Sequence, residues 1–283
     1  MKADLHIHTT FSDGELEPQQ AADLAKEAGL DLFAITDHDE CRGFGKMKST
    51  ADITAIAGIE LAAQYEGEVH VLGLCIDCSN ELLLKHVGKA SKSRENRALE
   101  MLEKLRRDDI NISMADIQAE CRGGVIGRPH MAAALVRKGY VASVAEAFDK
   151  YLSSRTPYYV PQRKISVSDA AALVQQAGGL PILAHPGLLK GTQLEALEPQ
   201  LKDMGFWGIE AYHPAHTDGQ CIEYESVARR QGLFVTTGSD YHGSCTPKVG
   251  IGGETRGGRY LVQSLKVLKY ENEKRNIYMA GRY

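Results

Sequence analysis

The stretch ADLHIHTTFSDG, residues Ala3 to Gly14, opens the chain with residue types that can do chemistry. A strand alternates its side chains between two faces, so His6 and His8 point the same way. Neighbouring imidazoles repel each other when both are protonated, and they lose solvation when buried without partners. A metal ion removes both problems, because neutral imidazole is a common ligand. The spacing, closely followed by Asp13, therefore predicts a metal site; the alternative is a surface strand with two chance histidines.

Further ligand types follow short apolar runs along the chain. They are Asp37 and His38 after LFAIT, Glu60 after IAGI, His70 within EVHVLGL, His185 after PILA, and Asp240 and His242 after FVTTGS. A lone histidine beside a strand is usually a core residue whose ring nitrogens are hydrogen-bonded, but so many histidines in equivalent places indicate one shared site. If the runs are strands of a βα barrel, their carboxyl ends meet on one face and form one pocket. Outside this pattern lie His86, His130, His213 and His216.

Seven apolar runs predict the strands that would position these residues. They are Asp4–His8, Leu32–Thr36, Ile56–Ile59, Val69–Leu74, Ile182–Ala184, Gly208–Ala211 and Phe234–Thr237. Helical patterns separate most of them: LEPQQAADLAKEAGL begins at Pro18 and stops at Gly29, and VSDAAALVQQAGGL has Ser168 as N-cap and stops at Gly178. This alternation predicts an α/β fold with parallel strands, and the strand number favours a barrel. The connection LAAQYEGE is too short for a crossover helix and predicts a hairpin that distorts the barrel.

Residues 81–164 have a different pattern. SKSRENRALEMLEKLRRDDI places Leu99, Leu102 and Leu105 at helical spacing, and RPHMAAALVRKGY and VAEAFDKYL predict two shorter helices. We therefore expect an all-helical insertion at 81–164, between the fourth and fifth strands of a barrel domain formed by 1–80 and 165–283.

The composition narrows the partners. The 283 residues are 43% hydrophobic, enough for a proper core, and the formal net charge is −4. This charge argues against an extended nucleic-acid surface but allows a small anionic substrate held by metal ions. No apolar run reaches membrane-span length, and no signal peptide is expected after Met1 and Lys2. Six scattered cysteines, including a lone Cys75-x-x-Cys78, predict a reducing cytoplasm and neither a disulfide framework nor a zinc or redox site.

Taken together, DLHIHTTFSDG, ITDHDE, GIEL, HVLGL, LAHPG and GSDYH resemble the successive motifs of the PHP (polymerase and histidinol phosphatase) domain, within the amidohydrolase superfamily. GRPHMAAALV and FDKYL in the insertion resemble segments of nucleotide-acting PHP phosphoesterases, including the 3′,5′-bisphosphate nucleotide phosphatases. The resemblance implies a distorted seven-stranded βα barrel with three divalent metal ions.

The resemblance also implies the ligands. One metal would be held by His6, His8, Glu60 and Asp240, a second by Glu60, His70 and His185 with Glu60 bridging, and a third by Asp13, His38 and His242. Six imidazoles and three carboxylates suit manganese, iron(II) or zinc, and a ligand set without thiolates argues against structural zinc. Three divalent ions against three carboxylates leave about three positive charges, which favours a phosphate attacked by a hydroxide that bridges two metals.

Donors for the substrate are expected near this pocket. Arg128 and His130 open a predicted helix whose N-terminal amides favour an anion, and a guanidinium can bind phosphate in a bidentate way. In YHPAHT, His213 and His216 could flank the pocket mouth, where one of them would protonate the leaving group. We therefore place His216 with Glu60 and Asp240 in the catalytic group, and His213 among the substrate contacts.

Two further basic residues are not expected to bind the substrate, and one position departs from the family pattern. Arg163 and Lys164 precede a predicted helix and are expected to be surface residues. Nucleotide-acting relatives tend to have Arg after His-Pro-Gly, where this chain has Leu188, so a phosphate or base contact is either missing or supplied from elsewhere.

The expected function is a cytoplasmic, metal-dependent phosphomonoesterase that acts on a small nucleotide such as a 3′,5′-bisphosphate. The alternatives are a phosphatase of a non-nucleotide metabolite such as histidinol phosphate and a 5′→3′ exonuclease on short RNA. Least favoured is a non-catalytic metal-binding module, because degenerate modules lose ligands and this chain keeps them.

Overall fold

The computed structural model describes residues 1–48, 50, 52–243, 249–252 and 258–280. Within this part of the chain, one mixed sheet contains the strands β1 (Ala3–Ile7), β2 (Leu32–Ile35), β3 (Thr54–Gln64), β4 (Glu68–Leu74), β5 (Ile165–Ser166), β6 (Leu180–Leu183), β7 (Gly208–Tyr212) and β8 (Phe234–Thr237). Neighbours follow the order β1-β2-β3-β4-β6-β7-β8, and the short β5 pairs with β3 off this path. The strands on the path are the seven predicted ones, whereas β5 was not predicted.

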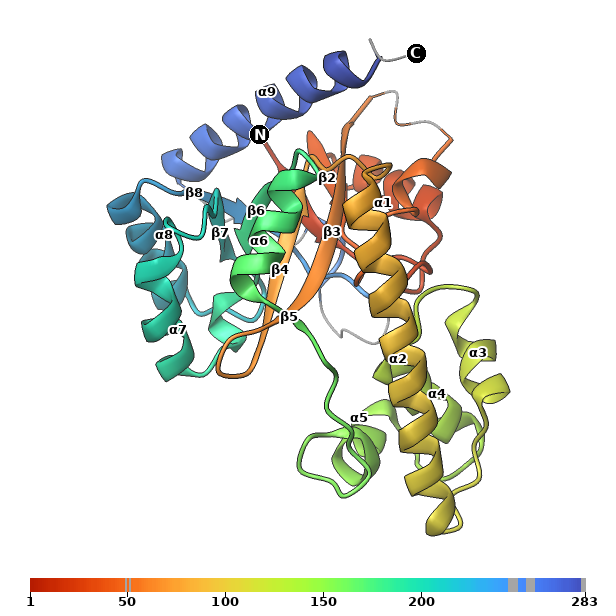
Figure 1. Ribbon diagram of the computed structural model, residues 1–283. Coiled ribbons are helices and arrows are strands. Elements are labelled where there is room, and N and C mark those ends of the chain that lie inside the picture. The colour runs from red at the N-terminus through yellow and green to blue at the C-terminus, as the bar shows by residue number, and fades with distance from the viewer. Residues whose placement is uncertain (49, 51, 244–248, 253–257, 281–283) are drawn as a thin grey trace.

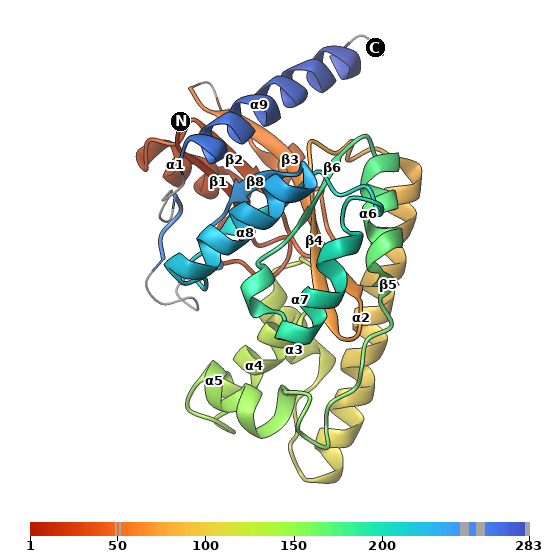
Figure 2. The same ribbon diagram turned by 90° about the vertical axis from the view of Figure 1, so that its left-hand side faces the viewer.

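The sheet curls into a nearly closed, distorted barrel, as predicted (Figures 1 and 2). Its pairs are parallel except around β4, which runs antiparallel to both β3 and β6. The predicted hairpin between β3 and β4 is thus confirmed. The segment after β8 returns to β1, because Ile7 and Tyr241 form a parallel bridge and the Asp4 carboxylate accepts a hydrogen bond from the Ser239 amide at 2.9 Å.

Helices and helical turns cover the barrel between its strands. They are α1 (Pro18–Glu27), η1 (Phe44–Lys46), α6 (Val167–Gln176), η3 (Pro186–Leu188), α7 (Gly191–Leu197), η4 (Glu198–Gln200), α8 (Asp218–Gln231) and α9 (Arg259–Ala280). The predicted stops at Gly29 and Gly178 are confirmed, since both have a positive φ just beyond a helix. The predicted N-cap at Ser168 is wrong: the Ser166 hydroxyl accepts the Asp169 amide at 3.0 Å, so the helix begins two residues earlier.

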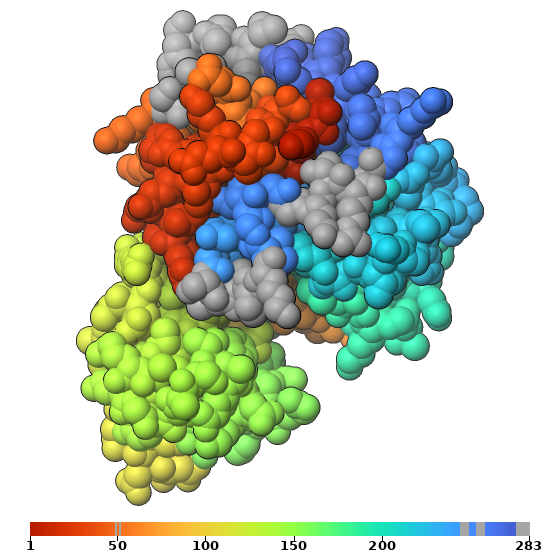
Figure 3. Space-filling model, turned by 180° about the vertical axis from the view of Figure 1, so that it is seen from behind, coloured from red at the N-terminus to blue at the C-terminus, as the bar shows by residue number. Residues whose placement is uncertain are grey.

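The elements described between β4 and β5 are all helical. They are α2 (Glu81–Arg107), α3 (Met114–Cys121), α4 (Arg128–Arg137), α5 (Val144–Ala147) and the π-helical turn η2 (Phe148–Leu152). The long helix α2 starts against the barrel and extends into a separate helical body (Figure 1), which projects from the barrel in Figure 3. The domain boundaries at 81 and 164 stay a prediction.

The barrel and the helical body have separate apolar cores. Leu83 and Val87, near the start of α2, pack into the barrel core, whereas Met101 and Leu105 pack into the core of the helical body. The predicted apolar stripe of α2 is partly wrong, because Leu99 is 48% exposed. Among the described residues, no helix combines the length and apolar character that crossing a membrane requires.

Candidate metal centre

Nine side chains predicted as metal ligands gather at the end of the barrel where its parallel strands finish. We call this group the metal cluster: His6, His8, Asp13, His38, Glu60, His70, His185, Asp240 and His242. His6, Glu60 and His70 lie within β1, β3 and the antiparallel β4, whereas the other six lie in the segments that follow β1, β2, β6 and β8. The barrel therefore brings together residues from both ends of the chain.

The first group contains His6, His8, Glu60 and Asp240, whose candidate ligand atoms all lie within 4.8 Å of one another. His8 Nε2 lies 3.2 Å from both Glu60 Oε2 and Asp240 Oδ1. His6 Nε2 lies 3.3 Å from Asp240 Oδ1 and 3.1 Å from His8 Nε2. Two imidazole nitrogens and two carboxylates thus face a common point.

The second group forms around the other side of Glu60. Its Oε1 atom lies 2.7 Å from His70 Nδ1 and 3.0 Å from His185 Nε2, the two histidines that we predict to share a metal ion with it. His38 also approaches, with Nδ1 2.8 Å from Glu60 Oε2, so that His38, Glu60 and His70 form a compact group of their own. The two oxygens of Glu60 thus face different histidines, the geometry that a bridging carboxylate needs.

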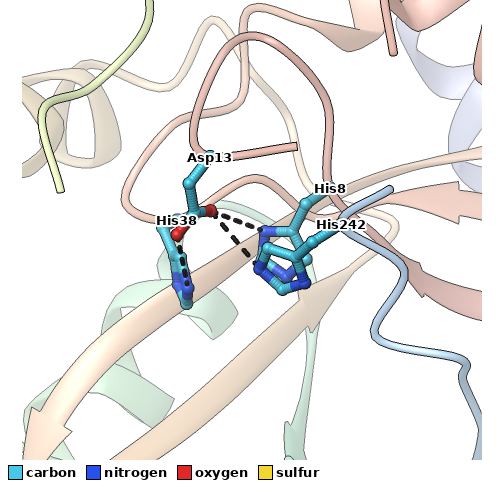
Figure 4. A group of neighbouring side chains, drawn as sticks. All are labelled: His8, Asp13, His38 and His242. Atoms are coloured by element: carbon cyan, nitrogen blue, oxygen red, sulfur yellow. Dashed lines mark ion pairs between the residues drawn. The ribbon is translucent and has the colours of Figure 1, made fainter. Parts of the chain in front are cut away.

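The third group surrounds Asp13, in the loop after β1 (Figure 4). Asp13 Oδ1 lies 3.4 Å from His242 Nε2 and 3.7 Å from His8 Nδ1, and Asp13 Oδ2 lies 3.9 Å from His38 Nε2. His38 therefore stands between the second and third groups, where its two ring nitrogens face different carboxylates.

Several buried polar atoms of this region make no hydrogen bond within the part of the chain that the structure describes. They are Asp13 Oδ1, His38 Nδ1, Glu60 Oε2, His185 Nδ1 and His213 Nε2. Such atoms are normally satisfied, so a concentration of them indicates a missing partner. Imidazole nitrogens and carboxylate oxygens are ligands of divalent transition metals, and these residues therefore fit metal ions.

A second set of side chains orients the histidines. His6 Nδ1 donates to Glu210 Oε1 at 3.1 Å, which leaves Nε2 unprotonated toward the metal cluster, and Glu210 Oε2 accepts the His185 amide at 2.8 Å. Ser12 lies 3.3 Å from His8 Nδ1 and donates to Asp37 at 2.7 Å. Such partners fix the tautomer of a ligand. Sequence reasoning did not assign these roles, although a glutamate inside the buried run GIEAY was a signal for Glu210.

Backbone geometry also indicates a functional site. His185 and Asp240 have φ values of 25° and 52°, a region that costs energy for residues other than glycine. The neighbouring Gly238 has no room for a side chain, because a Cβ there would lie 2.3 Å from both Glu210 Oε1 and His6 Cβ. Its small size lets the strand end approach the cluster closely.

The buried carboxylates stay ionised because histidines surround them. Burial alone would raise the pKa of Glu60, but the nearby histidines, led by His38, hold it well below its ordinary value. The pKa of Asp240 is held low in the same way, chiefly by His6. Burial lowers the pKa of His8, yet its carboxylate neighbours raise it to about 10. Protons and metal ions therefore compete for the same nitrogens.

The two histidines predicted near the pocket mouth have different roles. Both ring nitrogens of His216 are occupied: Nδ1 donates to the Ala211 carbonyl at 3.0 Å, and Nε2 accepts the Gly187 amide at 3.1 Å. This geometry contradicts the prediction of His216 as the catalytic proton donor. His213 Nδ1 accepts the Ala215 amide at 3.1 Å, which places the proton of the neutral ring on Nε2, 3.6 Å from Asp240 Oδ2.

The two predicted substrate contacts in the insertion, His130 and Arg128, lie in different environments. His130 is buried, its Nδ1 accepts the Gly127 amide at 2.9 Å, and it hydrogen-bonds the main chain of Ser12, so it joins α4 to the loop after β1. Arg128 is partly exposed and lies 4.0 Å from Glu68. Lys164 was expected at the surface, but only 9% of its side chain is exposed and it pairs with Glu68.

A cavity of about 360 Å³ lies between the barrel and the helical body, within the size range of small-molecule sites. Asp13, Asp240 and His242 of the metal cluster form one part of its lining. Phe148 and Val144 from the insertion contribute an apolar part. We call this space the candidate cavity; its lining combines polar side chains of the metal cluster with an apolar part from the insertion.

Known proteins that are similar in sequence and structure agree with this geometry. A family model of the PHP domain matches residues 4–159. The 5′-3′ exoribonuclease Rnm of Escherichia coli strain K12 is 30% identical over 250 residues, which cover 86% of this chain and 85% of that protein. The 3′,5′-nucleoside bisphosphate phosphatase of Chromobacterium violaceum is 31% identical and covers 84% and 86% of the two chains. The crystal structure of a protein assigned as a metal-dependent phosphoesterase from Bifidobacterium adolescentis matches with a TM-score of 0.83 and 30% identity, over 95% of this chain and 96% of that one.

Proposed function

The chain belongs to the PHP domain family and is a metal-dependent phosphoesterase, and from this premise we propose that it hydrolyses a phosphomonoester of a small nucleotide, such as a 3′,5′-bisphosphate. The supporting observation is the candidate cavity, which joins the metal cluster to an apolar wall of the insertion. A nucleoside placed against Phe148 would bring its phosphate to the metal ions that Asp13 and Asp240 would help to hold.

We further propose three divalent ions, of manganese, iron or zinc, in the three groups of the metal cluster. When bound, such ions supply a water of lowered pKa and neutralise phosphoryl oxygens. Glu60 would hold two of them, since histidines of two groups surround its carboxylate. His213 replaces His216 as the proton donor to the leaving oxygen, because its Nε2 carries the proton and faces Asp240.

A 5′→3′ exonuclease on short RNA is the second candidate function, because the relative from Escherichia coli carries that name. Both functions use the same hydrolytic step and differ in what lies beyond the reacting phosphate. The candidate cavity is lined by the insertion on one side, which favours a mononucleotide over a polymer.

The test compares kcat/KM for a 3′,5′-bisphosphate, a 5′-monophosphate, histidinol phosphate and a short RNA, each with manganese and with zinc. We expect the bisphosphate to lead by at least tenfold. A preference for histidinol phosphate would assign the enzyme to a non-nucleotide metabolite, and a preference for the RNA would make it an exonuclease. Hydrolysis of none of the four would contradict the proposal.

We also propose a cytoplasmic location. Cys41, Cys75, Cys78 and Cys121 carry free thiols, which supports a reducing compartment. Burial raises the pKa of Cys75 to about 12, so this cysteine is unsuited to metal binding as a thiolate.

A further inference from the structure

Two cysteines from different loops meet in the barrel core near the start of α2. Cys41 lies in the loop after β2, which also carries the candidate ligand His38, and Cys78 lies in the connection between β4 and α2. The Cys41 thiol lies 4.0 Å from the Cys78 carbonyl oxygen, and the two thiols also interact directly as hydrogen-bonding partners. Both side chains pack in the core that contains Leu83 and Val87 of α2. We call these two cysteines the thiol pair.

The Cys75-x-x-Cys78 spacing in the sequence does not predict the thiol pair. Cys75 is 6% exposed and lies toward α9, where its charged neighbours are Arg275 and Glu271. Cys78 interacts with Cys41 instead, although the two are far apart in the sequence. The fold therefore creates a pair of neighbouring thiols that no local motif indicates.

Backbone hydrogen bonds hold both segments of the thiol pair against β3. The Asp39 amide, in the loop after β2, donates to the Glu60 carbonyl at 2.8 Å. The Ile76 amide, in the connection before α2, donates to the Ala57 carbonyl at 3.2 Å. Because one strand positions both segments, the two sulfur atoms are neighbours by construction of the fold. Joining them requires mainly side-chain rotation, which is the condition for a disulfide that does not distort the backbone.

The two thiols differ in their access to solvent. Cys41 is 1% exposed, whereas Cys78 is partly exposed at the edge of the same core. The hydrogen bond with Cys78 and burial raise the pKa of the Cys41 thiol well above its ordinary value. A dissolved oxidant therefore reaches Cys78 first, and Cys41 is placed to complete a disulfide in a second step.

We propose that Cys41 and Cys78 are a site of reversible disulfide modification, which ties the loop that carries His38 to the start of α2. The oxidant is a small disulfide such as oxidised glutathione. The Cys78 sulfur attacks it, and one glutathione leaves with the Cys78 proton, so that a mixed disulfide remains. The Cys41 sulfur then displaces the second glutathione, which takes the Cys41 proton. The protein thiols are thereby oxidised to a disulfide, and the glutathione disulfide is reduced to thiols.

This disulfide adds a covalent link to a junction that an ion pair already holds. On α2, Arg94 Nε and Nη2 donate to Asp39 of the same loop at 2.9 and 2.6 Å. A disulfide that closes a long stretch of chain stabilises a protein chiefly by restricting its unfolded state. Oxidation should therefore raise the melting temperature. In a reducing cytoplasm such a link is transient, so the free thiols and the disulfide are two states of one site.

Peptide mapping tests the thiol pair directly. The folded, metal-loaded protein is incubated with oxidised glutathione, the remaining thiols are blocked with N-ethylmaleimide, and the digest is analysed without reductant. We expect a cross-link between the peptides that contain Cys41 and Cys78, which dithiothreitol removes. Cys78→Ser should abolish this cross-link, and the matched control Cys75→Ser should retain it. A link between Cys75 and Cys78, or glutathione on Cys78 without a cross-link to Cys41, would overturn the proposal.

Thermal denaturation tests whether the link ties the native loop in place. Oxidised wild type should melt at least about 4 °C above reduced wild type, a shift that a native-like disulfide in a chain of this size can supply. Oxidised glutathione should give the same rise in Cys75→Ser and none in Cys78→Ser. Cys78→Ala repeats the comparison without a hydroxyl group, in case serine disturbs the fold. A cross-link accompanied by an unchanged or lower melting temperature would show that the bond strains the loop, and the proposed tether would be wrong.

Discussion

Glu60 is the residue on which the metal cluster depends most. Its Oε1 faces His70 and His185, and its Oε2 faces His8 and His38, so a single side chain serves two groups of ligands. It is fully buried in β3 and lies opposite Leu72 in β4. A change at this position should therefore affect two metal positions together.

Replacing Glu60 by Gln should remove at least one metal equivalent and lower turnover by more than about 100-fold, beyond the range typical of residues that only orient ligands. The amide nitrogen would face histidines that need an acceptor or a shared metal. Metal content by mass spectrometry and kcat with excess manganese provide the measurement. Glu66→Gln, in the exposed turn of the same hairpin, is the control; full metal content and turnover in Glu60→Gln would disprove the assigned role.

Glu210 should act through His6 and His185 without binding a metal itself. Its two carboxylate oxygens accept hydrogen bonds from the His6 ring and the His185 amide. Burial raises the pKa of this carboxyl, but the nearby His6 lowers it to about 2. An amide cannot accept at both positions. We therefore expect Glu210→Gln to weaken metal affinity by about 10–100-fold with little loss of fold stability.

Competition with a chromophoric chelator measures that affinity directly, and chemical denaturation measures the stability. The exposed Glu195→Gln on α7 provides a control of equal charge change. If the affinity of Glu210→Gln equals that of wild type, the tautomer of His6 is set by something other than this carboxylate.

At the scale of elements, most of the barrel could be predicted because its strands are short apolar runs with clear helix stops between them. Pro18 and Gly29 delimit α1 as expected, and the short LAAQYEGE connection enforces the β3–β4 hairpin. The antiparallel pairing of β4 with β6 could not be predicted, because it depends on which edge the hairpin joins. The two-residue β5 carries too little pattern to recognise.

The predictions for Lys164 and His216 were wrong because they depend on contacts that only the tertiary structure creates. Lys164 precedes a helix, as many surface lysines do, but Glu68 and the helical body enclose it. The hydrogen bonds that occupy His216 come from main-chain groups of two separate segments, which no local pattern reveals. The candidate ligand positions carry a clearer pattern, because they lie within a short apolar run or in the segment that follows one.

The pair between Arg94 and Asp39 joins α2 to the loop after β2, and it should stabilise the molecule in a pH-dependent way. Burial would raise the pKa of Asp39, but Arg94 holds it below its ordinary value. A lowered folded-state pKa stabilises the fold above the unfolded-state pKa of about 3.9, and that contribution is lost as pH falls through the folded-state value. We expect Arg94→Met to lower the free energy of unfolding by about 3 kcal/mol at pH 7, because it leaves a buried carboxylate unpaired.

Urea denaturation at several pH values checks this expectation. The difference between wild type and Arg94→Met should shrink as pH falls, beginning above about 4, because burial without Arg94 raises the pKa of Asp39 and the variant is relieved first. Wild type loses the pair at a lower pH, as Asp39 protonates at its lowered folded-state pKa. The exposed Lys92→Met on the same helix is the control. A difference that stays constant with pH would mean that Arg94 stabilises α2 by packing alone.

At the scale of the whole molecule, the barrel and the helical body have separate cores, and the candidate cavity lies between them. The barrel contributes the metal cluster, and the helical body contributes apolar and basic side chains. Catalysis and substrate choice can thus change independently, which agrees with relatives named as a phosphatase and as an exoribonuclease.

Filling the candidate cavity should change substrate choice without abolishing catalysis. Ala133 lies on α4 and lines the cavity, so Ala133→Trp would place an indole where we propose that the nucleoside binds. We expect kcat/KM for a nucleotide to fall by at least about tenfold relative to kcat/KM for p-nitrophenyl phosphate, whose smaller leaving group needs less of the space. Ala119→Trp, on the exposed face of α3, is the control for adding an indole to the insertion. If Ala133→Trp lowers both activities equally and also loses metal, the cavity is part of the metal centre and does not select the leaving group. If neither activity changes, the nucleoside binds elsewhere.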